Sequence, residues 1–384
     1  MVRIASFNVE NLFARPRAFA SPDFDVGAPI LAAYHRVNEL MAKDDYDAND
    51  RLDMRHLLLA LDIYVRNQQG AIRRNTTQLP RWAWLRKNRG TFDRQPQDTT
   101  RDIEIVAPGR RGWIGWVELA TEPTNETGVR TTARVIREVG AEILAIIEAE
   151  DRPSLVRFNE ELLDGFYQHV MLVDGNDERG IDVGLMTRTG FPIRRIVSHV
   201  DTPDPQTGAA LFSRDCAQFE VATPGGAPLQ VLVNHFKSQS GGGDAKRRRQ
   251  AEEVRRIVNG LAAEGARVVA MGDLNEGPAA IGNHAASLEA LYNNNSPLRE
   301  CFGLNAFQVG GRPGTFDNCS IRNRLDYVFV SQDLASLVTG GGVFRDGLWG
   351  GRVTRPTDWG TYPEMLESVH QASDHAAVFL DLNL

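Results

Sequence analysis

The sequence predicts a layered fold of the α/β or α+β class, in which helices cover mixed β-sheets. Short apolar segments of strand length alternate with helical patterns from about residue 130 to the C-terminus, and no internal repeat interrupts them. The composition is that of an ordinary globular protein, because 42% of the 384 residues are hydrophobic and 24% are charged. A chain of this length can form one large domain or two.

The first third of the chain combines one strand with a long insertion. Val2 to Phe7 is an apolar strand. Residues 14–128 follow as a polar stretch rich in Arg, Asp and Asn, for which we expect irregular structure apart from a helical patch around Arg51 to Val65. We therefore predict a single domain over residues 1–384, with residues 14–128 as a lobe inserted into it.

The remaining elements alternate in type. A helix over Thr131 to Val139 has Gly140 as its stop signal, and a helix over Ser154 to Leu163 has Ser154 as N-cap and Pro153 before it. The other expected elements are strands at 143–147, 169–173, 182–186, 217–221, 229–234, 267–271, 326–330 and 376–382, a helix at 244–261 capped by Asp244, and a helix at 285–292.

Charge and cysteine content narrow the class of protein. The net charge of −7 provides no overall attraction to nucleic acid or membranes, so contact with a polyanion requires a local basic surface. The three cysteines have no paired spacing, which fits reduced thiols in a cytoplasmic protein. The sequence shows neither a signal-peptide pattern nor an apolar run long enough to span a membrane. We expect a soluble, cytoplasmic protein.

Polar side chains follow several of the apolar strands. Asp273 and Asn275 come directly after the run 268–271, and the two-residue period of a strand places both side chains on one side. An Asp there can polarise a water or hold a metal, and an Asn can donate to a phosphate oxygen. Similar polar groups at the ends of other expected strands are Asn8 with Glu10, Glu148, Asn234 with His235, and Asp374 with His375. Together they predict one cleft.

These motifs, in this order, resemble those of the endonuclease/exonuclease/phosphatase superfamily, which includes deoxyribonuclease I-like enzymes and bacterial nucleases. The matching segments are Phe7 to Leu12, Ile147 to Glu150, Asn234 to Ser238, Gly272 to Asn275, Arg324 to Val330 and Ser373 to His375. The resemblance covers residues 1–12 and about 130–384. It implies a four-layer sandwich of two packed mixed β-sheets flanked by helices, with the large insertion after the first strand and the site at one edge.

The resemblance implies a divalent metal site. Cleavage of a phosphodiester requires a cation near the phosphoryl oxygens, an activated water and a proton for the leaving alkoxide. Glu148 is the main expected ligand, because a carboxylate at a strand end suits Mg²⁺ or Mn²⁺. We expect Asn8, Glu10 and Asp374 to complete or orient the set of ligands.

Five residues receive catalytic roles from the same resemblance. His375 is expected to act as general base or phosphate ligand, oriented by Asp326. Asp273 competes with His375 for the role of base, and the sequence leaves this choice open. Asn275 is expected to bind the scissile phosphate, and His235 to act as general acid or phosphate donor.

Four further residues are candidates for phosphate binding. Lys237 and Ser238 follow His235 and can hold a non-bridging oxygen, although a solvated lysine is the alternative. Arg179 is expected to face the phosphate, with Asp182 directed toward a histidine.

The insertion bears on the substrate. Between Arg66 and Arg111 there are 11 Lys or Arg against 4 Asp or Glu, interleaved with the tryptophans Trp82, Trp84 and Trp113, and Trp116 follows. Such a composition suits phosphate contacts and base stacking, but the tryptophans can equally form a core for the lobe. A second basic cluster, Lys246 to Arg249, can contact phosphate or form a solvated helix face.

Three functions compete. We favour a metal-dependent phosphodiester hydrolase that cleaves DNA or RNA by metal-assisted attack of water, with nucleic acid as its partner. The alternative is a phosphatase or phosphodiesterase for a small or lipid phosphate, such as an inositol phosphate. A binding protein without catalysis is the least favoured, because none of the expected catalytic residues is missing. The sequence indicates no protein partner.

Overall fold

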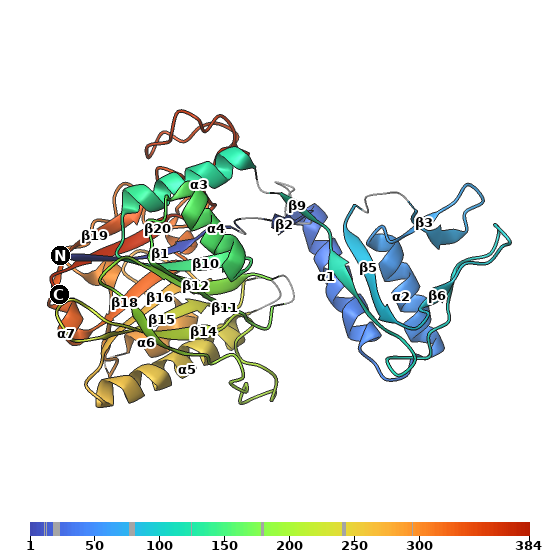
Figure 1. The fold of residues 1–384 in the computed structure, drawn as a ribbon, viewed down its shortest axis with the longest axis horizontal. Helices are drawn as coiled ribbons and strands as arrows, with labels where there is room; N and C mark the ends of the chain where they lie inside the picture. Colours follow the sequence, from blue (N-terminus) through green and yellow to red (C-terminus); the bar gives the residue numbers. More distant parts are fainter. Residues whose placement is uncertain are drawn as a thin grey trace. The chain divides into compact units, whose positions relative to one another are not determined.

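The computed structural model contains two six-stranded mixed sheets (Figure 1). The structure describes residues 1–10, 12, 14–17, 24–76, 81–123, 125–177, 180–239, 243–293 and 295–384. The first sheet has the strand order β11 (His169–Val173), β12 (Asp182–Thr187), β10 (Ile143–Ala149), β1 (Val2–Asn8), β20 (Ala377–Leu382), β19 (Val338–Phe344). The second has the order β13 (Ile193–Val197), β14 (Cys216–Val221), β15 (Leu229–His235), β16 (Arg267–Asp273), β18 (Asp326–Ser331), β17 (Leu298–Glu300).

The sheets pack face to face through alternate residues of their strands. In β10, Ile143, Ala145 and Ile147 belong to the cluster shared with the second sheet, whereas Leu144 and Ile146 face the helices. This division follows from the two-residue period of a strand, and a strand buried on both faces must be apolar at every position. One core of the large unit therefore lies between the two sheets.

Helices cover the outer face of each sheet. The first sheet packs against α3 (Glu126–Val139) and α4 (Arg152–Leu162), and the second against α5 (Asp244–Ala263) and α6 (Glu289–Tyr292). The shorter helices are α7 (Gln332–Ala335), η2 (Ala286–Leu288), η3 (Cys301–Gly303), η4 (Ile321–Asn323) and η5 (Ser368–His370). The predicted four-layer sandwich is confirmed.

The helix ends differ from the prediction in two places. Gly140 ends α3 in the left-handed conformation, as expected. The predicted cap of α4 was wrong, because the side chain of Asp151 accepts from the backbone N–H of Ser154, which lies inside the helix. For α5 the N-cap is Gly243 and Asp244 is the first helical residue, where its charge still suits the positive end of the helix.

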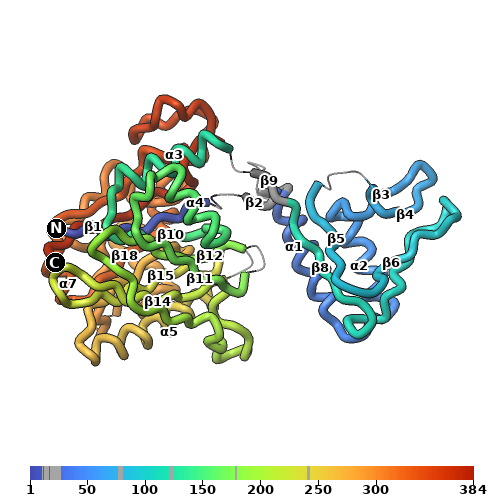
Figure 2. Tube along the Cα trace, in the orientation of Figure 1, coloured from blue at the N-terminus to red at the C-terminus, as the bar shows by residue number. Residues whose placement is uncertain are grey.

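The chain folds as two compact units. The large unit comprises Met1–Phe13 with Thr124–Leu384, and the inserted unit comprises Ala14–Pro123 (Figure 2). In the large unit the two chain ends are neighbours, since Val2 of β1 pairs with Leu382 of β20. Among the described residues, no helix is long and apolar enough to cross a membrane.

The inserted unit is more regular than predicted. It contains helices α1 (Phe24–Met41) and α2 (Ala48–Ala60) and the strand pairs β2 (Ala14–Pro16) with β9 (Thr121–Pro123), β3 (Tyr64–Arg66) with β4 (Ile72–Arg74), β5 (Ala83–Arg89) with β8 (Ile114–Leu119), and β6 (Asp93–Arg94) with β7 (Glu104–Ile105). These elements enclose a core of their own. The sequence concealed α1 because Pro29 lies inside it, and the helix expected at 51–65 ends at Ala60.

Candidate active site

Six strands bring the predicted polar residues to one edge of the sandwich. Because β1 runs parallel to β10 and β15 parallel to β16, their carboxyl ends lie at a common edge of each sheet. Strands β18 and β20 run antiparallel to β16 and β1, so the residues that precede or begin them reach the same edge. The side chains placed there are Asn8, Glu148, His235, Asp273, Asp326 and His375.

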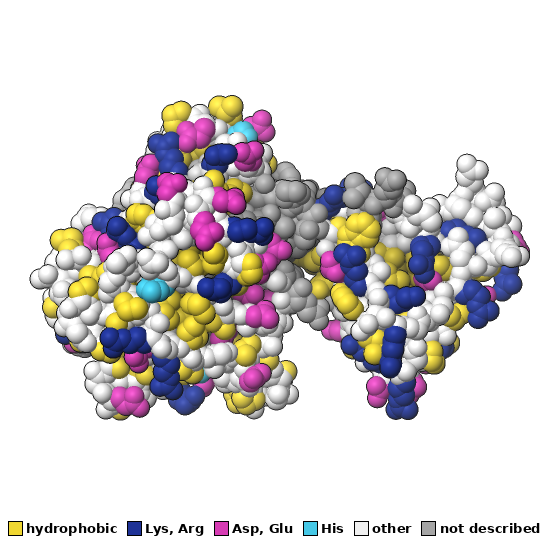
Figure 3. All heavy atoms as spheres, viewed as in Figure 1, with side chains coloured by type: hydrophobic (Ala, Val, Ile, Leu, Met, Phe, Trp, Pro, Cys, Tyr) yellow, Lys and Arg dark blue, Asp and Glu magenta, His cyan; other side chains and the backbone are white. Residues whose placement is uncertain are grey.

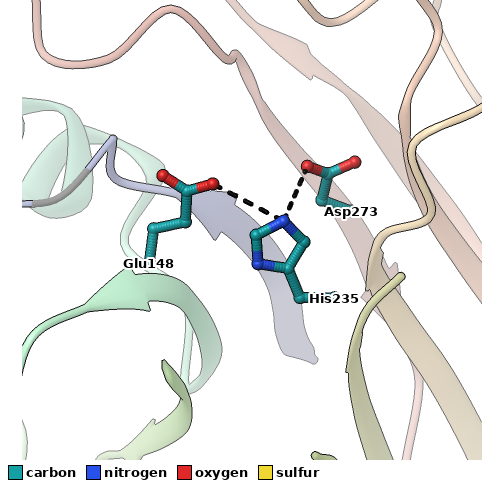
Figure 4. Close-up of side chains that lie close together, drawn as sticks. All are labelled: Glu148, His235 and Asp273. Carbon is teal, nitrogen blue, oxygen red and sulfur yellow. Dashed lines mark ion pairs between the residues drawn. The ribbon is translucent and has the colours of Figure 1, made fainter. Parts of the chain in front are cut away.

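Glu148, His235 and Asp273 form the first cluster at this edge (Figure 4). The Nε2 atom of His235 lies 3.5 Å from Oε1 of Glu148 and 3.5 Å from Oδ2 of Asp273. The potential ligand atoms of all three lie within 4.8 Å of one another. The side chain of Glu148 is 18% exposed, against 3% for each of the others, so Glu148 is the member that solvent reaches.

Asp326 and His375 form the expected dyad. The Nδ1 atom of His375 lies 2.8 Å from Oδ2 of Asp326, and its Nε2 atom lies 3.9 Å from Oδ2 of Asp273. Burial lowers the pKa of His375, but the carboxylates of Asp326 and Asp273 raise it by more, so that it lies well above its ordinary value. The two carboxylates therefore favour the protonated imidazole.

Asp273 is held by amide groups from two motifs. The Nδ2 group of Asn8 donates to Oδ2 at 3.2 Å, the backbone N–H of Asn275 donates to Oδ1 at 2.8 Å, and the Nδ2 group of Asn275 donates to Oδ2 at 3.2 Å. Burial raises the pKa of Asp273 to about 7, and the positive charge of His375 opposes that shift. Asp273 can thus accept or release a proton near neutral pH.

Backbone strain accompanies three of the predicted residues. Glu10, Glu148 and Asn275 have φ angles of 49°, 67° and 55°, in the left-handed region that non-glycine residues rarely adopt. Glu148 lies where the pairing of β10 with β12 is irregular. Asn275 contacts Asp273 because the backbone turns after β16. The two-residue period of a strand, from which their proximity was predicted, was therefore the wrong reason.

The predicted metal ligands form an acidic group whose chemistry fits a divalent cation. Burial raises the pKa of Asp374 well above its ordinary value, and the nearby charges of Glu10 and Glu148 raise it further. A cation would relieve this repulsion, and carboxylate oxygens are the ligands that Mg²⁺ and Mn²⁺ accept. The Oε2 atom of Glu10 accepts from the backbone N–H of Asp374 at 2.9 Å.

Asn8 is placed to orient this group. Its Oδ1 atom accepts from the backbone N–H of Glu10 at 3.1 Å, and its Nδ2 group donates to Asp273. Both ends of the amide are thus engaged, and the carbonyl oxygen is directed at the backbone. Asn8 connects the acidic group to Asp273.

The predicted phosphate-binding residues are only partly gathered. Lys237 and Ser238 directly follow β15, and Nζ of Lys237 lies 3.2 Å from Oγ of Ser238. Asp182 is buried, and its carboxylate accepts a hydrogen bond from the backbone N–H of Gly175 at 2.8 Å. The sequence predicted that Asp182 points toward a histidine, and the described contact is this backbone group instead. Arg179 lies outside the described residues.

Thr315 is a site residue that the sequence analysis missed. Its hydroxyl donates to Oδ2 of Asp326 at 2.6 Å and accepts from the backbone N–H groups of Leu325 at 3.0 Å and Asp326 at 3.1 Å. The side chain is fully buried. Phe316 follows it, with its ring centroid 4.7 Å from that of His375. A threonine between glycine and phenylalanine carries no sequence signal for this role.

Arg247 was expected only as part of a basic helix face. It is 2% exposed, and it donates to Glu276 at 3.1 Å and to the backbone carbonyls of Lys237 and Ser238, each at 3.1 Å. It therefore connects the loops that follow β15 and β16. Its spacing of three and seven residues from the buried Gln250 and Val254 on α5 was a signal for burial that could have found it.

Comparison with protein families and solved structures gives the following likenesses. The model of the Endonuclease/Exonuclease/phosphatase family matches residues 118–375. An endonuclease/exonuclease/phosphatase family protein from Bacteroides thetaiotaomicron is 18% identical, with a TM-score of 0.48, over 66% of this chain and 88% of that chain. A mannosyl-6-phosphatase from Bacteroides thetaiotaomicron is 19% identical, with a TM-score of 0.49, over 67% and 92%.

The catalytic domain of human Nocturnin, with bound sulfate, is 14% identical to this chain, with a TM-score of 0.48, over 67% of this chain and 86% of that chain. No curated protein matches the chain. The match to the family model covers more than half of the sequence and includes the motifs from Glu148 to His375. The chain belongs to the endonuclease/exonuclease/phosphatase family.

Proposed function

We propose that this protein is a divalent-metal-dependent phosphodiester hydrolase that cleaves nucleic acid. The observation that carries the proposal is the convergence of Glu148, His235, Asp273, Asp326 and His375 at one edge of the sandwich. Members of its family hydrolyse phosphoric esters, and the acidic and histidine cluster supports the same chemistry here. The residues 66–111, with 11 Lys or Arg against 4 Asp or Glu, favour a polymeric anion as the substrate.

In this proposal Glu148 and Asp374 hold the metal, with Glu10 supporting Asp374. The bound metal would neutralise negative charge on the phosphoryl oxygens. Asn8 holds Glu10 and Asp273 near each other through its two hydrogen bonds. Mg²⁺ or Mn²⁺ suits these oxygen ligands.

Asp273 is the proposed general base. Its pKa of about 7 allows Oδ2 to take a proton from the attacking water, whereas the nearby carboxylates raise the pKa of His375 and favour its protonated form. His375, held by Asp326, donates a hydrogen bond to a phosphoryl oxygen. Its Nε2 atom is 3.9 Å from Asp273, so both groups can reach one phosphate.

His235 is the proposed donor of a proton to the leaving oxygen. Its Nε2 atom lies 3.5 Å from Glu148, the proposed metal ligand, and 3.5 Å from Asp273, the proposed base. Both amide hydrogens of Asn275 are engaged, with Asp273 and the carbonyl of Phe236. Asn275 therefore orients the base in this scheme. Lys237 and Ser238 lie on the adjoining loop, and this scheme assigns them to a phosphate oxygen.

The test measures hydrolysis of a supercoiled plasmid, a single-stranded DNA, a structured RNA and an inositol polyphosphate, each with Mg²⁺, with Mn²⁺ and with EDTA. Wild type is compared with His375→Ala and Asp273→Asn, and with His284→Ala as a control for an exposed histidine outside the site. We expect metal-dependent cutting of a nucleic acid by wild type and by the control. Release of phosphate from the inositol substrate alone would replace the nuclease proposal with a phosphatase.

A further inference from the structure

The four tryptophans of the basic stretch do not share one environment. Trp113 is fully buried in the core of the inserted unit, with its ring centroid 4.5 Å from that of Phe92. Trp116 is 47% exposed, although it lies only three residues away. Trp84 is half-buried. The core therefore requires Trp113, and burial does not explain Trp116.

Trp84 and Trp116 lie on the same face of the two-stranded ribbon β5–β8. In this antiparallel pair Trp84 is opposite Glu118, and Arg86 is opposite Trp116. Leu85 and its partner Val117 face the core instead, as the two-residue period requires. The outer face of the ribbon thus includes two tryptophans, one arginine and one glutamate.

Charge on this face is positive at one end. Arg86 forms two hydrogen bonds with Glu118, at 2.8 and 3.0 Å, and its guanidinium carbon lies 5.4 Å from the ring centroid of Trp84. Arg89 pairs with Ile114, which is two residues from Trp116 on β8, so Arg89 lies on this face. It is exposed, and within the described part of the chain it forms no ion pair. Lys87 is opposite Gly115 and lies on the other face, with Leu85. Figure 3 shows Lys and Arg side chains spread over the visible face of the inserted unit.

The ribbon is rigid and its edge is covered. Asn38 of α1 bonds both backbone groups of Val117, donating to its carbonyl at 3.0 Å and accepting from its N–H at 2.9 Å. The free edge of β8 is therefore not open at this position to a further strand. A partner that binds this surface must use the side chains of the face.

A hollow of about 140 Å³ opens beside Trp84, with Arg74 and Asn75 among its lining residues. A water occupies roughly 30 Å³ of liquid, so the hollow is larger than a single water site. Trp84 offers it an aromatic wall on which a planar heterocycle can stack, and Asp62, Arg74 and Asn75 are the polar residues of its lining.

We propose that the outer face of the β5–β8 ribbon binds single-stranded nucleic acid, with Trp84 and Trp116 stacking on bases and Arg89 contacting a phosphate. The proposal rests on the function proposed above and names the surface of the chain that holds its substrate. Unpaired bases expose the rings that stack on tryptophan, and the charge of Arg89 complements a phosphate. Glu118 can accept from amino groups of bases.

Binding is tested with the full chain in the Asp273→Asn background, so that the probe is not cut, using a fluorescent single-stranded oligonucleotide. Trp116→Ala is expected to weaken the Kd roughly tenfold or more, as loss of a stacked base does. Leu52→Ala, which changes another exposed apolar residue of the inserted unit, is expected to leave it unchanged. Thermal unfolding confirms that each variant is folded.

The salt dependence of the Kd tests Arg89 separately. Arg89→Ser is expected to reduce the slope of log K against log salt by about 0.7, which is the contribution of one phosphate contact on a single strand. Arg36→Ser, on α1, is the control for the loss of a charge from the same unit. Parent-like binding by the tryptophan and cation variants, or no binding by the parent protein, would overturn the proposal.

Hydrolysis separates this inference from the proposed function. Wild type and Trp116→Ala are assayed on the oligonucleotide, as DNA and as RNA, and on bis-para-nitrophenyl phosphate. We expect a raised KM for the oligonucleotide and an unchanged rate on the small diester. Equal cleavage of the oligonucleotide by both proteins would refute the surface and leave the function standing. Binding that depends on Trp116 without cleavage of any nucleic acid would refute the function and support the surface.

Discussion

Replacement of Thr315 by valine isolates the contribution of one buried hydroxyl to the site. The hydroxyl donates to Asp326 and accepts from the backbone N–H groups of Leu325 and Asp326. Valine keeps the shape of the side chain, so no cavity forms, but it can make none of these bonds. Asp326 would then keep its contact with His375 and lose the second hydrogen bond to the same oxygen, Oδ2.

The expected cost follows from the groups left behind. Two buried N–H groups without partners cost roughly 1–3 kcal/mol each, and the bond to the carboxylate adds to this, so we expect Thr315→Val to lose roughly 3–5 kcal/mol of unfolding free energy. Misplacement of the dyad should lower kcat roughly tenfold to a hundredfold. Thr315→Ser keeps the hydroxyl and loses one methyl group, which costs about 1 kcal/mol.

Urea unfolding measures the first quantity and steady-state hydrolysis of a chromogenic phosphodiester the second. The slope of the urea transition must agree among the proteins for the comparison to hold. Combination with Asp326→Asn should reduce the effect of Thr315→Val on kcat, because Thr315 acts through that carboxylate. If Thr315→Val matched Thr315→Ser in both stability and kcat, the reasoning about the hydroxyl would be refuted.

Three further outcomes are expected. Because the raised pKa of Asp273, about 7, makes the folded protein bind protons more tightly than the unfolded chain, metal-free stability should fall as pH rises from about 4 to 7. Burial also raises the pKa of Asp374, a proposed ligand, so Mg²⁺ must displace a proton from Asp374; its shift of Tm should be larger at pH 8 than at pH 6, and equal shifts would contradict this. Arg247→Met should lower the unfolding free energy, measured with urea, by about 3–5 kcal/mol and should raise KM. Arg248→Met, at an exposed position of the same helix, should change neither quantity. Gly272→Ala should lower the unfolding free energy, measured with urea, by more than about 3 kcal/mol, since φ is 140° and the new Cβ would lie 1.9 Å from the carbonyl oxygen of Asn234. A urea midpoint equal to that of the wild type would show that β15 and β16 can move apart to accept the methyl group.

The large unit was predictable because its signals are local. An apolar strand such as 143–147 is followed at once by Glu148, and the same order recurs at Asp273. Strand ends gather at one edge of a sheet, so residues far apart in sequence could be assigned to one cleft. The pairing of Asp326 with His375 came from the family resemblance and agrees with the geometry.

Other parts depended on contacts that the local sequence encodes weakly or not at all. Thr315 reaches Asp326 because a loop folds back on β18, and a lone threonine does not reveal that. Arg247 looked like a member of a charged helix face, and only its spacing from Gln250 and Val254 indicated that the packing of α5 buries it. The helix α1 was missed, and Pro29 inside it argues against a helix.

The left-handed backbone at Glu10, Glu148 and Asn275 bears on how this protein would respond to directed evolution. Glycine at such a position would relieve roughly 1 kcal/mol of conformational strain, so a library screened for heat resistance alone should enrich glycine there. Each of these gains would remove a carboxylate or amide of the site. Substitutions that raise heat resistance at these three positions should therefore lower turnover. An engineering study should leave the three residues unchanged and introduce stabilising substitutions in the core between the sheets.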